Sequence, residues 1–241
     1  MITHTQNGYL TLEHLSNIEL YYTLPSLINE AEIILEEEEF HHCANVMRNS
    51  VGDVLFVTDG EGRLYETEIQ RISAKELFAK IKKKSEFENK SKDIWFCIPS
   101  IKNPDRLKFA FEKSVELGIT NFILFTSRYS VSRKPKSEKF EKTVLAAMKQ
   151  SLRTYLPKII SKEFSDIFQL GGTKILFDQN AEKIFDRTLE FKRPVYFLFG
   201  PEGGFDEKEI TQVDFSNRFT LSSKRLRSET AIIKCASLLN L

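Results

Sequence analysis

Short apolar stretches separated by polar residues predict β-strands in the first part of the chain. An apolar run at 54–58 leads into residues 59–62 (DGEG), which have the composition of a hairpin turn, and a second strand follows at 63–72. Apolar and polar side chains alternate over 77–82, as in a strand with one buried face. Several short strands close together favour a small β-barrel, and 38–48 is predicted to be a short helix between strands.

A polar, charged segment separates this part from a second one with a different period. Residues 82–92 (KKKSEFENKSK) are rich in lysine, and we place a linker at 87–91. The sequence therefore predicts two domains, residues 1–88 and 89–241. In the second domain, apolar runs predict strands covered on both faces, at 94–98, 122–126, 174–177, 195–199 and 219–221.

Between these strands, apolar residues recur at helical spacing. The predicted helices begin at Asn103-Pro104, at Ser137, after Phe205 and near Ser228. Gly118 is expected to end the first of them, and Pro157 the second, whose apolar stripe continues through Tyr155. Alternating strands and helices predict an α/β fold with a largely parallel sheet and helices on both of its faces.

The composition is that of an ordinary soluble protein, with 41% hydrophobic and 29% charged residues in 241. No apolar run approaches the roughly 18 residues of a membrane span, and no secretory signal pattern is present, so we expect a cytoplasmic protein without a membrane partner. The cysteines Cys43, Cys97 and Cys235 are odd in number and far apart. His41 and His42 precede Cys43, but adjacent side chains on a helix do not face one another, so no metal site is expected.

The two parts of the chain differ in charge. Residues 1–90 hold 9 Lys and Arg against 16 Asp and Glu, whereas residues 91–241 hold 26 against 18. The excess of positive charge is concentrated in 128–158, with nine Lys and Arg against two Glu. Such a segment is either a phosphate-contacting surface or a solvated helix face. We interpret it as a contact for RNA phosphates and name as candidates Arg128, Arg133, Lys134 and Lys136.

A glycine-rich segment after a buried strand is the first candidate for chemistry. In 195–210 (VYFLFGPEGGFDEKEI) a continuous apolar run enters Gly200-Pro201-Glu202-Gly203-Gly204. Asp206 then caps a helix, with Glu209 in capping-box position. Ligands bind at this place in parallel sheets, and glycines let the backbone approach them closely. The segment lacks the pattern of a Walker loop or a dinucleotide fingerprint, and a simple tight turn is the alternative.

A cationic segment before the C-terminal helix is the second candidate. In 221–231 (LSSKRLRSETA) three cations precede Glu229. A carboxylate in the first turn suits the helix dipole, so Glu229 is either a cap or a proton acceptor. Arg227 is either solvated or directed into a site, where it would stabilise developing negative charge.

Taken together, ordered motifs across nearly the whole chain resemble one family. They are His41-His42 with Val46-x-Arg48 and Val51-Gly52-Asp53; Lys113-x-x-Glu116-Leu117-Gly118-Ile119; Ser130; Gln150-Ser151-x-Arg153 with Pro157; Gly200-Pro201-Glu202-Gly203-Gly204-Phe205; and Leu226-Arg227-Ser228-Glu229-Thr230-Ala231. The set is similar to the bacterial small-subunit ribosomal RNA uridine-N3 methyltransferases, the RsmE type, a branch of the knotted SPOUT methyltransferases.

The resemblance implies an N-terminal PUA-like β-barrel that helps to hold ribosomal RNA and a C-terminal α/β domain with a trefoil knot. It also implies a homodimer and S-adenosyl-L-methionine as cofactor. The expected cofactor-binding residues are Leu198, Gly200, Pro201, Glu202, Gly203, Gly204, Leu221, Ser222, Leu226 and Thr230. The expected RNA contacts add His42 and Arg48 to the four basic residues above. Arg227 and Arg153 are the candidates to stabilise the uridine anion, with Glu229 as a possible proton acceptor.

One position departs from the family pattern, because Ser222 stands where similar proteins usually carry glycine. A glycine with positive φ is not freely replaced, which puts the cofactor contacts of this loop in doubt. Two alternatives therefore stay open: a ribose 2′-O methyltransferase of the same superfamily, and a non-catalytic RNA-binding assembly factor. The expected partner is ribosomal RNA of the small subunit, either naked or within an assembled particle.

Overall fold

The computed structural model describes residues 18–128, 137–239 and 241, and the chain divides into two compact units. The first unit comprises the chain up to Asn89 together with Met148–Leu156. The second comprises Lys90–Ala147 and Pro157–Leu241. In the described part of the chain, no helix is both long and apolar enough to cross a bilayer.

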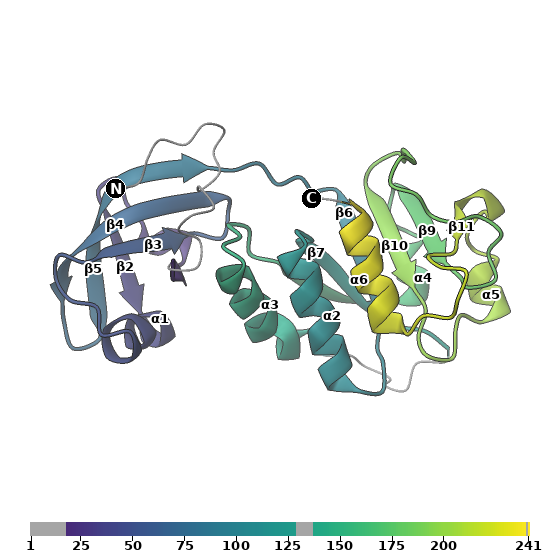
Figure 1. The fold of residues 1–241 in the computed structure, drawn as a ribbon, viewed down its shortest axis with the longest axis horizontal. Helices are drawn as coiled ribbons and strands as arrows, with labels where there is room; N and C mark the ends of the chain where they lie inside the picture. Colours follow the sequence, from purple (N-terminus) through teal and green to yellow (C-terminus); the bar gives the residue numbers. More distant parts are fainter. Residues whose placement is uncertain (1–17, 129–136, 240) are drawn as a thin grey trace. The chain divides into compact units, whose positions relative to one another are not determined.

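The first unit contains a five-stranded sheet in the order β1-β3-β4-β5-β2 (Figure 1). Its strands are β1 (Leu20–Tyr22), β2 (Glu32–Glu36), β3 (Val54–Thr58), β4 (Arg63–Ile72) and β5 (Glu76–Glu86). The strand β1 runs parallel to β3, and the other pairs are antiparallel. Thr23, just after β1, donates its hydroxyl to the carbonyl of Ile34 in β2 at 2.8 Å, so the two edge strands of this half-barrel approach each other.

The helix predicted at 38–48 is present in two pieces. The α-helix α1 (Glu37–His41) continues into one π-helical turn, η3 (His42–Val46), and Cys43 of that turn is buried in the core. A 3-10 turn, η2 (Pro25–Leu27), connects β1 towards β2. The core is formed by the inward positions of the strands, as period-two alternation predicts; its buried members include Ile33, Leu35, Leu55, Val57, Ile69, Leu77 and Ala79.

Met148–Leu156 pairs with the hairpin turn between β3 and β4. Gly62 donates its amide to the carbonyl of Thr154 at 2.9 Å, and Leu156 donates to the carbonyl of Gly60 at 2.9 Å. This arrangement corrects the prediction that one helix runs through Tyr155 to Pro157. The helix α3 (Glu138–Gln150) ends earlier, because Leu152 adopts a left-handed φ of 55°, which helical backbone excludes.

The second unit contains a six-stranded, all-parallel sheet in the order β11-β9-β10-β6-β7-β8. The strands are β6 (Ile94–Pro99), β7 (Asn121–Thr126), β8 (Lys158–Glu163), β9 (Thr173–Phe177), β10 (Val195–Phe199) and β11 (Arg218–Phe219). The helices of this unit besides α3 are α2 (Pro104–Glu116), α4 (Phe164–Ile167), α5 (Glu207–Ile210) and α6 (Ser228–Leu239), with a 3-10 turn η4 (Phe215–Asn217). The α/β fold with a largely parallel sheet is confirmed, and the trefoil knot stays a prediction.

Successive side chains along each strand of this sheet point to opposite faces. Phe96, Phe122 and Phe197 point to one face, where Phe111 of α2 meets Phe122 with ring centroids 5.1 Å apart. The helices α2 and α6 lie side by side over this face (Figure 1). Cys97 and Leu198 point to the other face, among buried residues of the short helix α4. Both faces are therefore covered, as the continuous apolar runs predict.

The hydrophobic pattern does not predict three of the strands, namely β1, β2 and β8. The edge strand β8 is half exposed along its length, and its sequence, KIISKE, lacks the continuous apolar run of a central strand. The strand β1 has three residues, too few for a periodic signal. Edge and very short strands depend on pairing with a neighbour, which a local pattern does not record.

Candidate functional site

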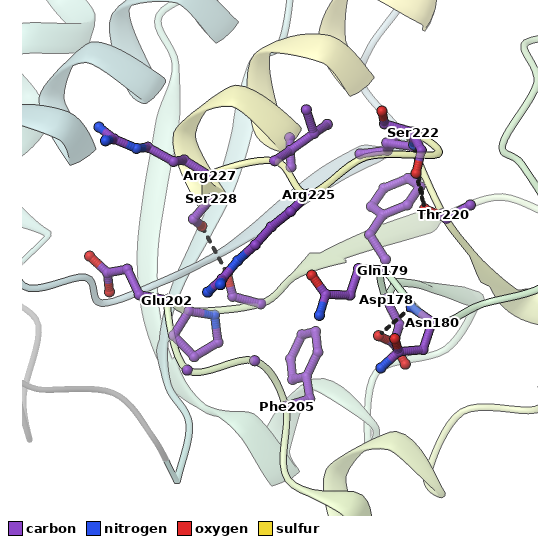
Figure 2. A pocket seen from close by; sticks show the side chains of 18 of the residues that line it. Asp178, Gln179, Asn180, Glu202, Phe205, Thr220, Ser222, Arg225, Arg227 and Ser228 are labelled. Carbon is purple, nitrogen blue, oxygen red and sulfur yellow. Dashed lines mark hydrogen bonds between the residues drawn. The ribbon is translucent and has the colours of Figure 1, made fainter.

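A pocket of about 680 Å³ lies in the second unit, where β9, β10 and β11 end (Figure 2). In a parallel sheet the carboxyl ends of the strands lie along one edge, and the loops that leave them form a crevice. Three such loops line the pocket, together with Arg106 of α2. The lining residues in these loops are 178–180 after β9, 200–205 after β10, and 220–222 and 224–227 between β11 and α6.

The loop after β10 is glycine-rich for steric and conformational reasons. A side chain at Gly200 would approach the Phe205 ring to 3.3 Å, tighter than an ordinary contact. Gly204 has a φ of +75°, a left-handed conformation that glycine adopts without strain. Asp206 then begins α5 with the predicted capping box: its side chain accepts the amide of Lys208, and its own backbone amide donates to the Glu209 carboxylate at 2.8 Å. The loop is thereby fixed between a buried strand and a capped helix.

The cationic loop before α6 is joined directly to the glycine loop. Ser228 donates its hydroxyl to the carbonyl of Gly200 at 2.8 Å. Thr220 donates its hydroxyl to the carbonyl of Ser222 at 2.9 Å, and the Ser222 hydroxyl accepts the amide of Lys224 at 3.1 Å. Ser222 is not among the described residues with positive φ, so serine fits this position without the strain that a glycine-only conformation would impose.

Two arginines of this loop point in different directions. In Figure 2 the Arg225 side chain crosses the pocket between Ser228 and Gln179, whereas the Arg227 side chain extends away from Gln179. Glu202 and Asp178 also line the pocket; in Figure 2 the Glu202 side chain extends away from Arg225, and the Asp178 carboxylate accepts the amide of Asn180 at 3.0 Å. The pocket therefore offers groups of both charges to a ligand.

Most of the cofactor-binding residues expected from the sequence meet at this pocket. Those on its walls are Gly200, Pro201, Glu202, Gly203, Gly204, Leu221, Ser222 and Leu226. Leu198 and Thr230 lie just outside the lining: Leu198 is fully buried in β10, and Thr230 is exposed on the first turn of α6.

The three catalytic candidates do not all share this pocket. Arg227 lines it. Glu229 does not line it, but its carboxylate pairs at 3.7 Å with the guanidinium of Arg106, which does. Arg153 belongs to the first unit, and burial lowers the pKa of its guanidinium. The structure thus brings Arg227 and Glu229 to one region and places Arg153 in another unit.

The candidate RNA contacts fall in several places. His42 pairs with Glu19, Nε2 to Oε1, at 3.0 Å in the first unit, and Arg48 is exposed there with a φ of 59°. Arg128 pairs with Asp206 at 2.9 Å in the second unit. The other candidates lie outside the described residues; they are Arg133, Lys134 and Lys136.

Several residues of the pocket are missing from the sequence prediction. The most informative are Asp178, Gln179 and Asn180, which follow the correctly predicted strand β9. A polar tripeptide after a buried parallel strand is a signal that sequence reasoning can use, because the strand's carboxyl end lies at the ligand edge. Arg106 carries no such signal, since it reaches the pocket from the side of α2.

The three cysteines do not line this pocket. All three thiols are buried, and burial raises the pKa of each. A buried thiol with a raised pKa is a poor nucleophile. Among the residues that the structure describes, no cluster of three His, Cys, Asp or Glu side chains is arranged to hold a metal ion.

Comparison with known families matches both parts of the chain. A family model described as an RNA methyltransferase domain matches residues 88–240, and one described as an RNA methyltransferase PUA domain matches residues 35–82.

Individual relatives agree with these matches. The chain is 31% identical to ribosomal RNA small subunit methyltransferase E 1 of Borreliella burgdorferi, over 83% of this chain and 89% of the relative. It is 27% identical to ribosomal RNA small subunit methyltransferase E of Aquifex aeolicus, over 86% and 93%. A crystal structure of the Neisseria gonorrhoeae ribosomal RNA small subunit methyltransferase E bound to S-adenosyl methionine superposes with a TM-score of 0.79 at 25% identity, covering 92% of this chain and 96% of that one.

Proposed function

This chain belongs to the ribosomal RNA small subunit methyltransferase E family, and we propose that it transfers a methyl group from S-adenosyl-L-methionine to N3 of a specific uridine in 16S ribosomal RNA. One observation carries the proposal. The glycine loop and the cationic loop enclose a single pocket, and the Ser228–Gly200 hydrogen bond joins them at 2.8 Å. The relative from Neisseria gonorrhoeae binds S-adenosyl methionine, and its fold matches 92% of the present chain.

The pocket has the size and chemistry to hold this cofactor. Its volume of about 680 Å³ lies within the usual range of roughly 300–1,000 Å³ for small-molecule sites. Backbone groups of the glycine loop suit the polar edges of an adenosyl group. The carboxylates of Asp178 and Glu202 suit its ammonium and sulfonium charges, and the arginines suit its carboxylate. When bound, the cofactor supplies a methyl group already activated on a sulfonium.

The residues of this chain are then needed for alignment and for charge. Uridine N3 becomes a good nucleophile when it loses its proton, and a nearby guanidinium stabilises the resulting anion. Arg227 is suited to this role, because it lines the pocket. Its side chain extends away from Gln179 on the opposite wall, which leaves its guanidinium for a group other than the cofactor. Arg153 remains a second candidate. Glu229 remains the candidate proton acceptor, and its carboxylate pairs at 3.7 Å with Arg106, a residue of the pocket wall.

The substrate must reach this pocket with its Watson–Crick edge exposed. N3 lies on that edge, so the target uridine must be unpaired or swung out of its helix. We propose that the N-terminal domain, residues 1–88, positions the RNA, with His42 and Arg48 among its contacts. The methyltransferase domain, residues 89–241, would add phosphate contacts from the lysines and arginines of residues 128–158. We further propose that the protein acts in the cytoplasm as a homodimer.

The decisive experiment uses small-subunit particles from a strain that lacks this gene. Purified protein is incubated with the particles and with methyl-labelled S-adenosylmethionine, and the modified nucleoside is identified by mass spectrometry. We expect label on the base of one uridine, with the fragmentation of 3-methyluridine. A ribose methyl would show instead the 2′-O class. Absence of cofactor binding in a calorimetric titration would support the assembly-factor alternative.

A further inference from the structure

We propose that Arg128 is a positioning residue for the cofactor pocket: through Asp206 it holds the far end of the glycine loop, residues 200–205. The sequence suggests a phosphate contact for this arginine, but its contacts in the structure are directed to α5. The inference rests on the proposed function, because the loop it would position is the proposed cofactor loop.

Arg128 contacts both carboxylates of the α5 capping box. Its guanidinium lies 2.9 Å from Oδ2 of Asp206, and its backbone amide donates to Oε1 of Glu209 at 2.9 Å. The same two carboxylates cap the helix, since Asp206 Oδ1 accepts the amide of Lys208 and Glu209 Oε2 accepts the amide of Asp206. Each carboxylate therefore uses one oxygen for the helix and the other for Arg128.

These contacts act where the glycine loop ends. One end of the loop is fixed by β10, which is hydrogen-bonded on both sides in the sheet. The other end is Phe205, next to Asp206, and its ring stacks on Phe125 with centroids 6.5 Å apart and planes 5° apart. Phe125 lies near the carboxyl end of β7, and Arg128 follows that end by two residues. The carboxyl end of β7 thus supports the loop twice, by a ring contact and by an ion pair.

The exposure of the pair limits the expected effect. The Asp206 side chain is 12% exposed, but that of Arg128 is 62% exposed, so solvent screens part of the attraction. The amide of Arg128 keeps its bond to Glu209 in any side-chain variant. Replacement of the side chain therefore removes one of two contacts, and we expect a loosened loop with the fold intact.

The test compares Arg128→Gln, Asp206→Asn and the double variant with the wild type. In Asp206→Asn the side chain keeps the oxygen that caps the helix and loses only its charge. Arg128→Gln likewise removes one charge, so the two single variants are comparable. Lys208→Gln is the control, because it removes one positive charge from the exposed surface of α5 outside this ion pair. Two quantities are measured in the full chain: amide hydrogen exchange of residues 203–205 without cofactor, and the Kd for S-adenosylmethionine by calorimetry.

We expect each single variant to exchange these amides faster and to bind cofactor about fivefold more weakly, and the double variant to be no worse than either, since contacting residues are not additive. Lys208→Gln should match the wild type. If the amides of residues 203–205 exchange at the wild-type rate in Arg128→Gln, the proposal is overturned. It is also overturned if this variant keeps the wild-type cofactor affinity but binds RNA more weakly, with the salt dependence of RNA binding reduced by about one phosphate contact. A wild type that binds no cofactor refutes the proposed function instead, and the exchange of the loop still decides the role of Arg128.

Discussion

Two hydroxyl side chains organise the loop that carries Arg225 and Arg227. Thr220 and Ser222 bond to the backbone of the loop itself, which fixes the short turn after β11. The sequence shows that Ser222 departs from the family pattern but not whether the position needs a positive φ. Backbone conformation settles that point, and the structure gives Ser222 no left-handed φ.

The Ser222 hydroxyl should contribute a small part of cofactor affinity. Ser222→Ala removes the acceptor of the Lys224 amide, and Ser222→Gly also adds freedom to the unbound loop. We expect Kd for S-adenosylmethionine to rise about twofold in the first and somewhat more in the second, from the loss of one exposed hydrogen bond. Calorimetric titration measures both, with Ser223→Ala as the neighbouring control. Tighter binding by the glycine variant would contradict this account.

Arg227 should matter for the chemical step more than for cofactor binding. Its side chain extends away from Gln179 in Figure 2, and a charge that stabilises only the developing anion lowers the barrier without changing ground-state binding. Arg227→Gln should lower kcat by on the order of 100-fold, with the cofactor Kd unchanged. Arg187→Gln, an exposed arginine outside the pocket, is the control. A normal kcat with weakened RNA binding would make Arg227 a phosphate contact.

At the scale of elements, buried strands are the part of the fold that periodicity locates well. The strands β3, β4 and β10 have the bounds that the apolar pattern predicts, because each contributes a face or two faces to a core. The end of α3 is different. An apolar stripe continues to Tyr155, but its last members are used in the pairing of residues 154–156 with the β3–β4 turn. The apolar stripe therefore marks packed residues both in α3 and in the segment that follows it, although only α3 is helical.

That pairing makes Gly62 a sensitive position of the first unit. A side chain at Gly62, where φ is +97°, would overlap the Tyr155 ring, whose hydroxyl donates to the carbonyl of Phe87 at 2.7 Å. Gly62→Ala should lower the free energy of unfolding by about 2 kcal/mol or more, from strain and overpacking together. Gly52→Ala is a matched control, with the same φ and no atom within 4 Å, so it reports the backbone strain alone. Chemical denaturation measures both, and equal losses would show that Tyr155 does not crowd Gly62.

At the scale of the whole molecule, buried thiols link stability to pH. Cys97 and Cys235 are fully buried, and burial raises the pKa of both in the folded state. In the unfolded chain these thiols ionise near their ordinary pKa of about 8.5. Above that pH the unfolded state binds fewer protons than the folded state, so stability falls as pH rises; below it, the contribution of the thiols is fully present.

We therefore expect the urea concentration at the unfolding midpoint to decrease as the pH is raised from about 8.5 to about 10.5. Each thiol should lower the free energy of unfolding by up to about 1.4 kcal/mol per pH unit. The paired substitution Cys97→Ala with Cys235→Ala should flatten this dependence. Because the other titrating groups are the same in both proteins, the difference between the two curves isolates the thiols. Parallel curves would show that the two cysteines ionise equally in the folded and unfolded states.

The sequence by itself determined the two-part α/β organisation, the buried strands, the capped start of α5 and the identity of the glycine and cationic loops. Each of these follows from local chemistry, because burial periodicity, capping and turn preferences act within a few residues. The tertiary structure decided which loops meet. It brought Arg106 to the pocket, tied Arg128 to the α5 cap, grouped Arg153 with the other unit and gave Ser222 an ordinary backbone. Strand order and the packing of distant segments fix these relations, and no local pattern encodes them.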